Sequence, residues 1–230
     1  MRVFAIGDLH LSGGMDKPMN VFGEQWDNHF ARISQSWQNE VADDDLVLIP
    51  GDLSWAMQLE NAKPDLEAIA SLPGRKLILR GNHDYWWSSL TQLRAALPKS
   101  MSALQNDAFE YEACVVCGTR LWTCPTIQTV TADDEKIYLR ELGRLKLSIG
   151  AAKKLSKDKP LVCMLHYPPI TEGANGSEVA DILAESGVSF CVYGHLHGAG
   201  IKAGFNGDFC GVEYRLVSCD ALSFSPLRII

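Results

Sequence analysis

The chain has 230 residues, of which 47% are hydrophobic and 21% charged, and its 21 basic and 28 acidic side chains give a net charge of −7. This composition is that of an ordinary globular protein, and it excludes a disordered tail, a collagen-like fibre and a coiled coil. The acidic balance argues against a partner such as long nucleic acid or an anionic membrane surface, because binding either needs a basic patch. The length suits a single domain, which we expect to span residues 1–230.

The N-terminal apolar run, Val3–Ile6, ends at Gly7-Asp8, far too early for a signal peptide, and no later stretch approaches the length of a membrane span. We therefore expect a cytoplasmic protein. Its seven cysteines lie at irregular spacing in apolar segments, as is typical of buried thiols in a reducing compartment. Cys114 and Cys117 are the one candidate zinc or redox pair. The β-branched residues between them instead indicate a strand, in which positions three apart point to opposite faces.

The first half of the chain alternates apolar runs of strand length with segments of helical spacing. Continuous apolar runs indicate strands that are buried on both faces, and apolar residues at intervals of three to four indicate helices. In chain order the pattern predicts a strand at Val3–Ile6, a helix at Glu24–Glu40, a strand at Leu46–Ile49, a helix over Leu66 and Ile69, a strand at Lys76–Leu79 and a helix at Ser89–Leu97. Pro64 is expected in the first turn of its helix, where a missing N–H is tolerated.

The second half begins with a predicted hairpin, in which Phe109–Val116 and Leu121–Thr123 are joined through Gly118. The elements predicted after it are a helix at Glu135–Leu155, a strand at Leu161–Leu165, a helix at Ser177–Glu185 and strands at Phe190–Tyr193 and Val212–Val217. Because strands alternate with helices, the sequence predicts an α/β layered protein, of the α+β class in that it carries some antiparallel sheet.

Five of these strands are followed at once by loops that carry side chains able to bind a metal. Ligand sites of layered α/β proteins lie beyond the carboxyl ends of the strands, so the five loops are expected to meet at one edge. Their candidate ligands are Asp8, His10, Asp52, Asn82, His166, His195 and His197. Mixed imidazole and carboxylate ligands suit Mn²⁺, Fe²⁺ or Zn²⁺. Seven ligands are too many for one tetrahedral ion but suit two divalent metal ions that share a carboxylate, the arrangement that acts on phosphate esters.

The motifs resemble those of the calcineurin-like metallophosphoesterase family, in the expected order over residues 8–197. They are Asp8-Leu9-His10, Gly51-Asp52, Gly81-Asn82-His83-Asp84, His166 and Gly194-His195-Leu196-His197. The resemblance implies a two-sheet mixed β-sandwich flanked by helices. It implies that one metal is held by Asp8, His10 and His197, that the other is held by Asn82, His166 and His195, and that both share Asp52. It also implies that His83 is the general acid and that Asp84 orients the His83 imidazole.

We therefore expect hydrolysis of a small phosphate ester by in-line attack of a metal-bridging hydroxide, with His83 protonating the leaving oxygen. A phosphodiester is favoured over a small phosphomonoester. Trp55 and Ala56 depart from the residues that protein Ser/Thr phosphatases carry there, and Trp55 from the tyrosine of purple acid phosphatases. Because the stretch after His197 is short, we do not expect the cap that the repair-nuclease branch carries. A non-catalytic metal-binding scaffold is the alternative from another class. The natural substrate, the native metal and the oligomeric state stay open.

Several other residues near the motifs have two interpretations. The aromatic residues Trp55, Tyr85, Trp86, Trp87 and Tyr167 either stack on a planar group of the substrate or, as we favour, pack beneath the loops. The loops Leu11–Gly23 and Gly198–Asp208 are substrate lids or solvated connections. The cations Lys17, Arg80 and Lys202 are candidate phosphate contacts. His29 lies away from every motif in the sequence and is expected to be a structural or surface residue.

Overall fold

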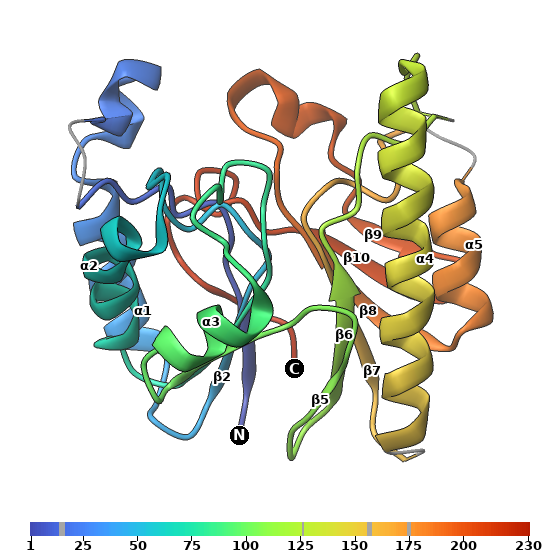
Figure 1. The fold of residues 1–230 in the computed structure, drawn as a ribbon, viewed down its shortest axis with the longest axis horizontal. Coiled ribbons are helices and arrows are strands. Elements are labelled where there is room, and N and C mark those ends of the chain that lie inside the picture. Colours follow the sequence, from blue (N-terminus) through green and yellow to red (C-terminus); the bar gives the residue numbers. More distant parts are fainter. Residues whose placement is uncertain (14–16, 126, 156–157, 174–175) are drawn as a thin grey trace.

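The computed structural model describes residues 1–13, 17–125, 127–155, 158–173 and 176–230. Two β-sheets face each other at the centre, and helices cover the outer face of each (Figure 1). The first sheet is covered by α1 (His29–Glu40), α2 (Leu59–Ala70) and α3 (Leu90–Ala96), and the second by α4 (Ala132–Leu155) and α5 (Glu178–Glu185). The predicted layered fold with two mixed sheets between helices is confirmed.

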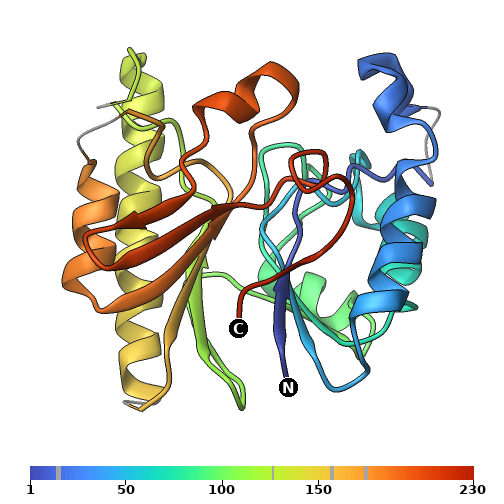
Figure 2. The same cartoon turned by 180° about the vertical axis from the view of Figure 1, so that it is seen from behind.

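Each sheet has parallel strands at its centre and an antiparallel strand at an edge. The first has the order β11 (Leu227–Arg228), β1 (Val3–Ala5), β2 (Leu46–Ile49), β3 (Arg75–Ile78) and β4 (Met101–Ala103), with β11 antiparallel. The second has the order β5 (Phe109–Glu110), β6 (Val115–Thr119), β7 (Leu161–Leu165), β8 (Val188–Tyr193), β10 (Val212–Leu216) and β9 (Gly207–Phe209), with β5 and β9 antiparallel. Because β1 pairs with β11, the two termini lie close together (Figure 2).

The central strands are apolar along their whole length because both of their faces are buried. In β2, Val47 and Ile49 pack against the helices, whereas Leu46 and Leu48 point between the two sheets. Burial of each such side chain contributes roughly 1.5–3 kcal/mol, so register shifts in these strands are strongly disfavoured. The continuous apolar runs in the sequence therefore identified the strands that support the loops.

Two predicted helix starts are wrong, and both lie in the first half of the chain. The segment expected to be one helix over Glu24–Glu40 divides into a 3₁₀ turn, η2 (Glu24–Trp26), and α1. The break lies at Asn28, whose backbone is left-handed with φ of 50°. Pro64 lies inside α2 and not in its first turn. The other helices begin within three residues of expectation, and none of the described helices is long and apolar enough to cross a bilayer.

The hairpin is formed by other residues than predicted. β5 pairs with β6, and Gly118, expected in the turn, lies within β6. A Cβ at Gly118 would collide with the carbonyl group of Met164 on β7, so the glycine allows two strands to approach closely. The segment 121–123 forms no strand, because Leu121 has left-handed backbone with φ of 61°. The strands β4, β9 and β11 were not predicted, because each has only two or three residues and shows no recognisable hydrophobic pattern.

Cys114 and Cys117 point to opposite faces of the second sheet, as the strand interpretation predicts. Cys114 lies between the two sheets, and Cys117 packs in the core beneath the helices α4 and α5. Burial raises the pKa of the Cys114 thiol to about 12, and a hydrogen bond with Cys163, followed by burial, raises the pKa of Cys117. The pair therefore has neither the geometry nor the thiolate character of a zinc or redox site.

Candidate metal centre

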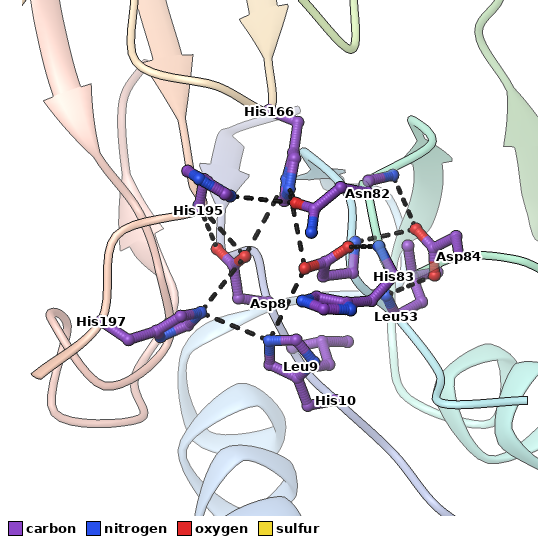
Figure 3. A network of polar contacts seen from close by, with 12 residues as sticks. Asp8, Leu9, His10, Leu53, Asn82, His83, Asp84, His166, His195 and His197 are labelled. Atoms are coloured by element: carbon purple, nitrogen blue, oxygen red, sulfur yellow. Dashed lines mark hydrogen bonds and ion pairs between the residues drawn. The ribbon is translucent and has the colours of Figure 1, made fainter. Parts of the chain in front are cut away.

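The loops that follow β1, β2, β3, β7 and β8 meet at one edge of the two sheets, where their polar side chains converge (Figure 3). They are held together by backbone hydrogen bonds, among them Asp8 N–H to the Gly51 carbonyl at 2.9 Å and Gly194 N–H to the His166 carbonyl at 3.1 Å. All seven candidate ligands lie in this cluster, as predicted from the order of strands and loops.

Asp8, His10 and His197 form the first group of potential ligands. The Nε2 atoms of the two histidines lie 3.3 Å apart, and His197 Nε2 lies 3.5 Å from Asp8 Oδ1. One ligand atom from each residue lies within 4.8 Å of the others. The structure thus brings together the three residues that the resemblance assigns to one metal.

Asn82, His166 and His195 form the second group. Asn82 Oδ1 lies 2.6 Å from His166 Nε2 and 2.9 Å from His195 Nδ1. Asp52 lies between the groups, because its Oδ2 atom is 3.6 Å from His166 Nε2 and 3.8 Å from His10 Nε2. This position is the one that a shared carboxylate requires.

Four of the ligand residues have left-handed backbone, which is uncommon for residues with a side chain. The φ angles are 57° at Asp8, 46° at His10, 53° at Asp52 and 75° at His195. Each such conformation costs about 1–2 kcal/mol and persists only where surrounding structure enforces it. These residues follow the ends of β1, β2 and β8, so the strained backbone lies in the loops that carry the candidate ligands.

Three carboxylates, Asp8, Asp52 and Asp84, are buried together. The ion pairs of Asp8 and Asp52 with described residues are all to histidines. Burial and the neighbouring charges of Asp84 and Asp8 raise the pKa of Asp52. Burial also acts to raise the pKa of Asp8, but hydrogen bonding and charge attraction from His197 outweigh it and lower that pKa. So much negative charge in a buried site favours divalent cations.

The histidines of the second group are neutral at physiological pH. Burial lowers the pKa of His166 to about 3 and that of His195 to about 4. A neutral imidazole keeps the nitrogen lone pair that binds a metal. The buried carboxylates and the neutral imidazoles of His166 and His195 therefore fit divalent metal ions. Burial acts to lower the pKa of His197, but hydrogen bonds to Asp220 and Asp8 outweigh it and raise that pKa to about 10. Metal binding at the first group would therefore displace a proton from His197.

Asp220 was missed in the sequence and orients one of the ligands. Its Oδ1 atom lies 2.8 Å from His197 Nδ1, which leaves Nε2 directed at Asp8. The Pro50 carbonyl does the same for His166, at 2.9 Å from Nδ1. Asp220 follows the predicted strand Val212–Val217 by three residues, so its place after a buried strand was the signal that could have identified it.

Contrary to the expectation that Asp84 orients the His83 imidazole, the part of the chain that the structure describes shows no hydrogen bond between the two side chains. Its carboxylate accepts hydrogen bonds from the backbone N–H groups of Asp52, Leu53, Ser54 and Gly81 and from Trp86 Nε1. Because these donors surround both oxygens, Asp84 joins the Asp52 loop to the Gly81 loop. His83 is held instead through its backbone N–H, which donates to Asp52 Oδ1 at 2.8 Å.

The His83 ring lines an open cavity of about 750 Å³ that also exposes His10, Asp52, His195 and His197. Burial, followed by the charge of Lys17 in the same lining, lowers the pKa of His83. A phosphate ester bound at the two ligand groups would therefore lie within this cavity, beside His83.

The aromatic residues divide between the two interpretations. Trp86 and Trp87 are buried beneath the loops, as favoured, and Tyr167 stacks on His195 with centroids 4.0 Å apart. Trp55 is buried against His10, at 4.7 Å between centroids, but it also lines the cavity. Tyr85 is 54% exposed and lines the cavity as well, so the packing interpretation is wrong for it.

The other candidate residues from the sequence, which are three cations and His29, lie in different parts of the structure. Of the candidate phosphate contacts only Lys17 lines the large cavity; Arg80 lines a separate cavity of about 110 Å³, and Lys202 lies exposed in η3 (Gly198–Ala203). His29 is structural, since its Nε2 atom lies 2.9 Å from the Leu9 carbonyl directly behind the first ligands. Within the loop Leu11–Gly23, residues 14–16 lie outside the described residues, and residues 19–22 form the 3₁₀ turn η1 (Met19–Phe22).

The chain resembles known proteins in family and in fold. No curated protein matches the sequence. Among solved structures, the phosphopantetheinyl hydrolase PptH from Mycobacterium tuberculosis has a similar fold, with a TM-score of 0.59, 13% identity and coverage of 100% of this chain and 95% of that one. The protein of unknown function AQ665 from Aquifex aeolicus is 14% identical over 99% of this chain and 95% of its own, with a TM-score of 0.49. The sequence matches the calcineurin-like phosphoesterase family over residues 1–199, a span that contains all seven candidate ligands, and the chain belongs to that family.

Proposed function

We propose that this protein is a dinuclear metal-dependent phosphoesterase that hydrolyses phosphodiesters or small phosphomonoesters. The observation that carries the proposal is the position of Asp52 between two complete groups of ligands, at the base of a cavity that also exposes His83. A scaffold without catalytic function would have no need for a histidine held beside the shared carboxylate.

Each residue has a defined part in this proposal. Asp8, His10 and His197 would hold one divalent ion, Asn82, His166 and His195 would hold the other, and Asp52 would be shared by both. Two such ions would supply Lewis acidity and would activate water for in-line displacement at phosphorus.

His83 is the proton donor to the leaving oxygen. Its ring lies in the cavity and its backbone is fixed to Asp52, so it can reach the ester oxygen that faces away from the ligands. His166 and His195 do not compete for this role, because the ring nitrogens that they direct at Asn82 are the atoms that would bind the metal.

Hydrolysis of two simple esters tests the proposal. Bis-p-nitrophenyl phosphate and p-nitrophenyl phosphate are assayed with added Mn²⁺, and we expect hydrolysis of at least one, with the diester favoured. Asp52→Asn should reduce the rate by at least 100-fold, whereas the matched control Asp44→Asn, at a side chain 79% exposed, should not change it. Absence of hydrolysis of either ester would contradict the proposal and favour a scaffold.

A further inference from the structure

The cavity beside the ligand groups is much larger than a phosphate group requires. Its volume of about 750 Å³ lies in the range, about 300–1,000 Å³, of pockets that enclose a whole organic ligand. A phosphate group has only five non-hydrogen atoms. Most of the cavity is therefore available to the organic part of an ester bound at the metals.

Beyond the candidate ligands the lining of the cavity is mostly apolar, although it also includes Lys17 and Gln25. The apolar part begins directly beside His10 and His197. It is formed by Met19, Phe22, Trp26, Trp55, Met57 and Tyr85, and we call these six residues the apolar wall. Phe22 is 55% exposed and Met57 56% exposed, although both side chains are large and apolar. They come from two segments that are distant in the sequence and meet at one opening. Exposed apolar side chains gathered in one place indicate a binding surface.

Trp55 makes the apolar wall continuous with the metal centre. One ring contact is with the ligand His10, at 4.7 Å between centroids, and another is with Phe22, at 6.5 Å and nearly parallel. The indole Nε1 lies 3.1 Å from the Met19 sulfur, so the ring is held in place. Lys17 Nζ lies 3.3 Å from the centroid of the Trp55 ring. An organic group attached to a phosphate at the ligands would therefore pass beside Trp55 and the Lys17 side chain on its way to Phe22.

We propose that the substrate is a phosphate ester whose organic group is large and apolar, either an alkyl chain of several carbons or an aromatic ring system, and that this group binds the apolar wall. The position of the phosphate rests on the proposed function, and the new claim is that the organic group of the substrate is apolar. The occupant is the ester itself, because the wall and the metal ligands line one continuous cavity. A small polar alcohol would leave Phe22 and Met57 in water.

Binding of two phosphonates, which resist hydrolysis, tests the substrate class directly. Titration calorimetry with the Mn²⁺-loaded protein compares octylphosphonate with methylphosphonate. Each buried methylene can strengthen binding by up to about fourfold, so we expect octylphosphonate to bind at least tenfold more tightly, with a negative heat-capacity change. Equal affinities for the two phosphonates would overturn the proposal.

Truncation of the apolar wall identifies where the chain binds. Phe22→Ala and Met57→Ala should each lower the octyl-to-methyl affinity ratio by roughly threefold to tenfold. Both side chains are more than half exposed, so the variants should fold, which circular dichroism checks. The matched control is Leu147→Ala, which truncates an apolar side chain 62% exposed on α4 and should keep the ratio. A ratio that falls no further in the wall variants than in this control would overturn the proposal.

Hydrolysis separates this inference from the proposed function. Methyl and octyl p-nitrophenyl phosphates share one leaving group, and we expect a kcat/KM at least tenfold higher for the octyl ester. Equal kcat/KM values together with equal phosphonate affinities would overturn the apolar class and leave the phosphoesterase function intact. Selective binding of octylphosphonate without hydrolysis of either ester would overturn the phosphoesterase function and support the apolar site.

Discussion

Asp220 accepts a hydrogen bond from His197 Nδ1 at 2.8 Å and a second from the Gly198 backbone N–H at 3.0 Å. Two donors thus hold the carboxylate, and the carboxylate in turn holds the imidazole. Its second nitrogen, Nε2, then faces Asp8 and His10. Carboxylates in this position fix the tautomer and orientation of a histidine that binds a metal.

We expect Asp220→Asn to weaken metal binding. Loss of such a partner typically costs 10- to 100-fold in metal affinity, and Asn can hold the ring only through a weaker, neutral hydrogen bond. Equilibrium dialysis with Mn²⁺ measures the effect on the site that contains His197. Asp44→Asn serves as the control at an exposed carboxylate. An unchanged Mn²⁺ affinity in Asp220→Asn would show that His197 is oriented by its packing alone.

His83→Gln should slow the hydrolysis of esters with poor leaving groups much more than that of activated esters. A general acid contributes roughly 10²- to 10⁴-fold where the leaving oxygen needs a proton, and little where p-nitrophenolate leaves unaided. The measurement is kcat for methyl phenyl phosphate against methyl p-nitrophenyl phosphate. Equal losses on the two substrates would remove His83 from the role of proton donor.

Asp84→Asn should give the opposite pattern, with equal losses on both esters and lower stability. Asp84 accepts five hydrogen bonds, and an amide nitrogen in place of one oxygen would face backbone N–H groups. Leaving such buried donors unpaired costs about 1–3 kcal/mol, which denaturant unfolding measures. A loss confined to the ester with the poor leaving group would instead indicate a direct effect of Asp84 on His83.

The order of strands and loops was sufficient to predict that the candidate ligands lie close together, because each of them follows a buried strand. Val3–Ile6 and Phe190–Tyr193 belong to different sheets, yet their carboxyl ends meet at one edge, so Asp8 and His195 had to be close. The role of Asp84 could not be predicted in this way. It depends on the left-handed backbone at Asp52, which directs three successive N–H groups at one carboxylate, and no local pattern specifies that conformation.

Tertiary contacts also explain the errors in the fold. Glycine is common in turns, so Gly118 was expected in one. Its position within β6 is explained by the close approach of Met164 on the neighbouring strand, which leaves no room for a side chain. The spacing of Trp26, Ile33 and Trp37 is that of one continuous helix, but the helix is interrupted at Asn28. The interruption places Trp26 against His197, with ring centroids 5.6 Å apart. The helical spacing in the sequence does not indicate this contact.

Asp45 should contribute stability that is lost in acid. Burial acts to raise its pKa, but hydrogen bonds from the Arg2 side chain, at 2.6 and 3.0 Å, and from backbone N–H groups outweigh it and lower the pKa to about 2. A pKa that is lower in the folded protein stabilises the fold above about pH 4, and this contribution disappears as the pH falls through 2. Because Arg2 is 39% exposed, we expect about 1–2 kcal/mol at pH 7.

Denaturant unfolding of the wild type and Asp45→Asn at two pH values measures this contribution. The wild type should be more stable than Asp45→Asn by about 1–2 kcal/mol at pH 7. The difference should fall to about a third of that value at pH 2.5, where Asp45 is protonated in the unfolded chain but only partly in the folded protein. Comparing the two proteins cancels the loss of metal in acid, which is common to both. A difference that stays constant between the two pH values would mean that the charge of Asp45 contributes nothing.

Cys210 should be the one thiol of the native protein that reacts rapidly with a disulfide reagent. It is exposed, whereas the other six cysteines are buried. The thiolate is the reactive form of cysteine. Burial raises the pKa of Cys114 to about 12, so the Cys114 thiol stays protonated at neutral pH and reacts slowly. We therefore expect one fast-reacting thiol in the native wild type, none in Cys210→Ser and seven in guanidinium chloride, measured by release of the thionitrobenzoate chromophore. Cys114→Ser should leave the metal content unchanged. Two results would restore the zinc or redox interpretation of Cys114 and Cys117. One is a lower metal content in Cys114→Ser than in the wild type. The other is a second fast-reacting thiol that is present in the wild type and absent from Cys114→Ser.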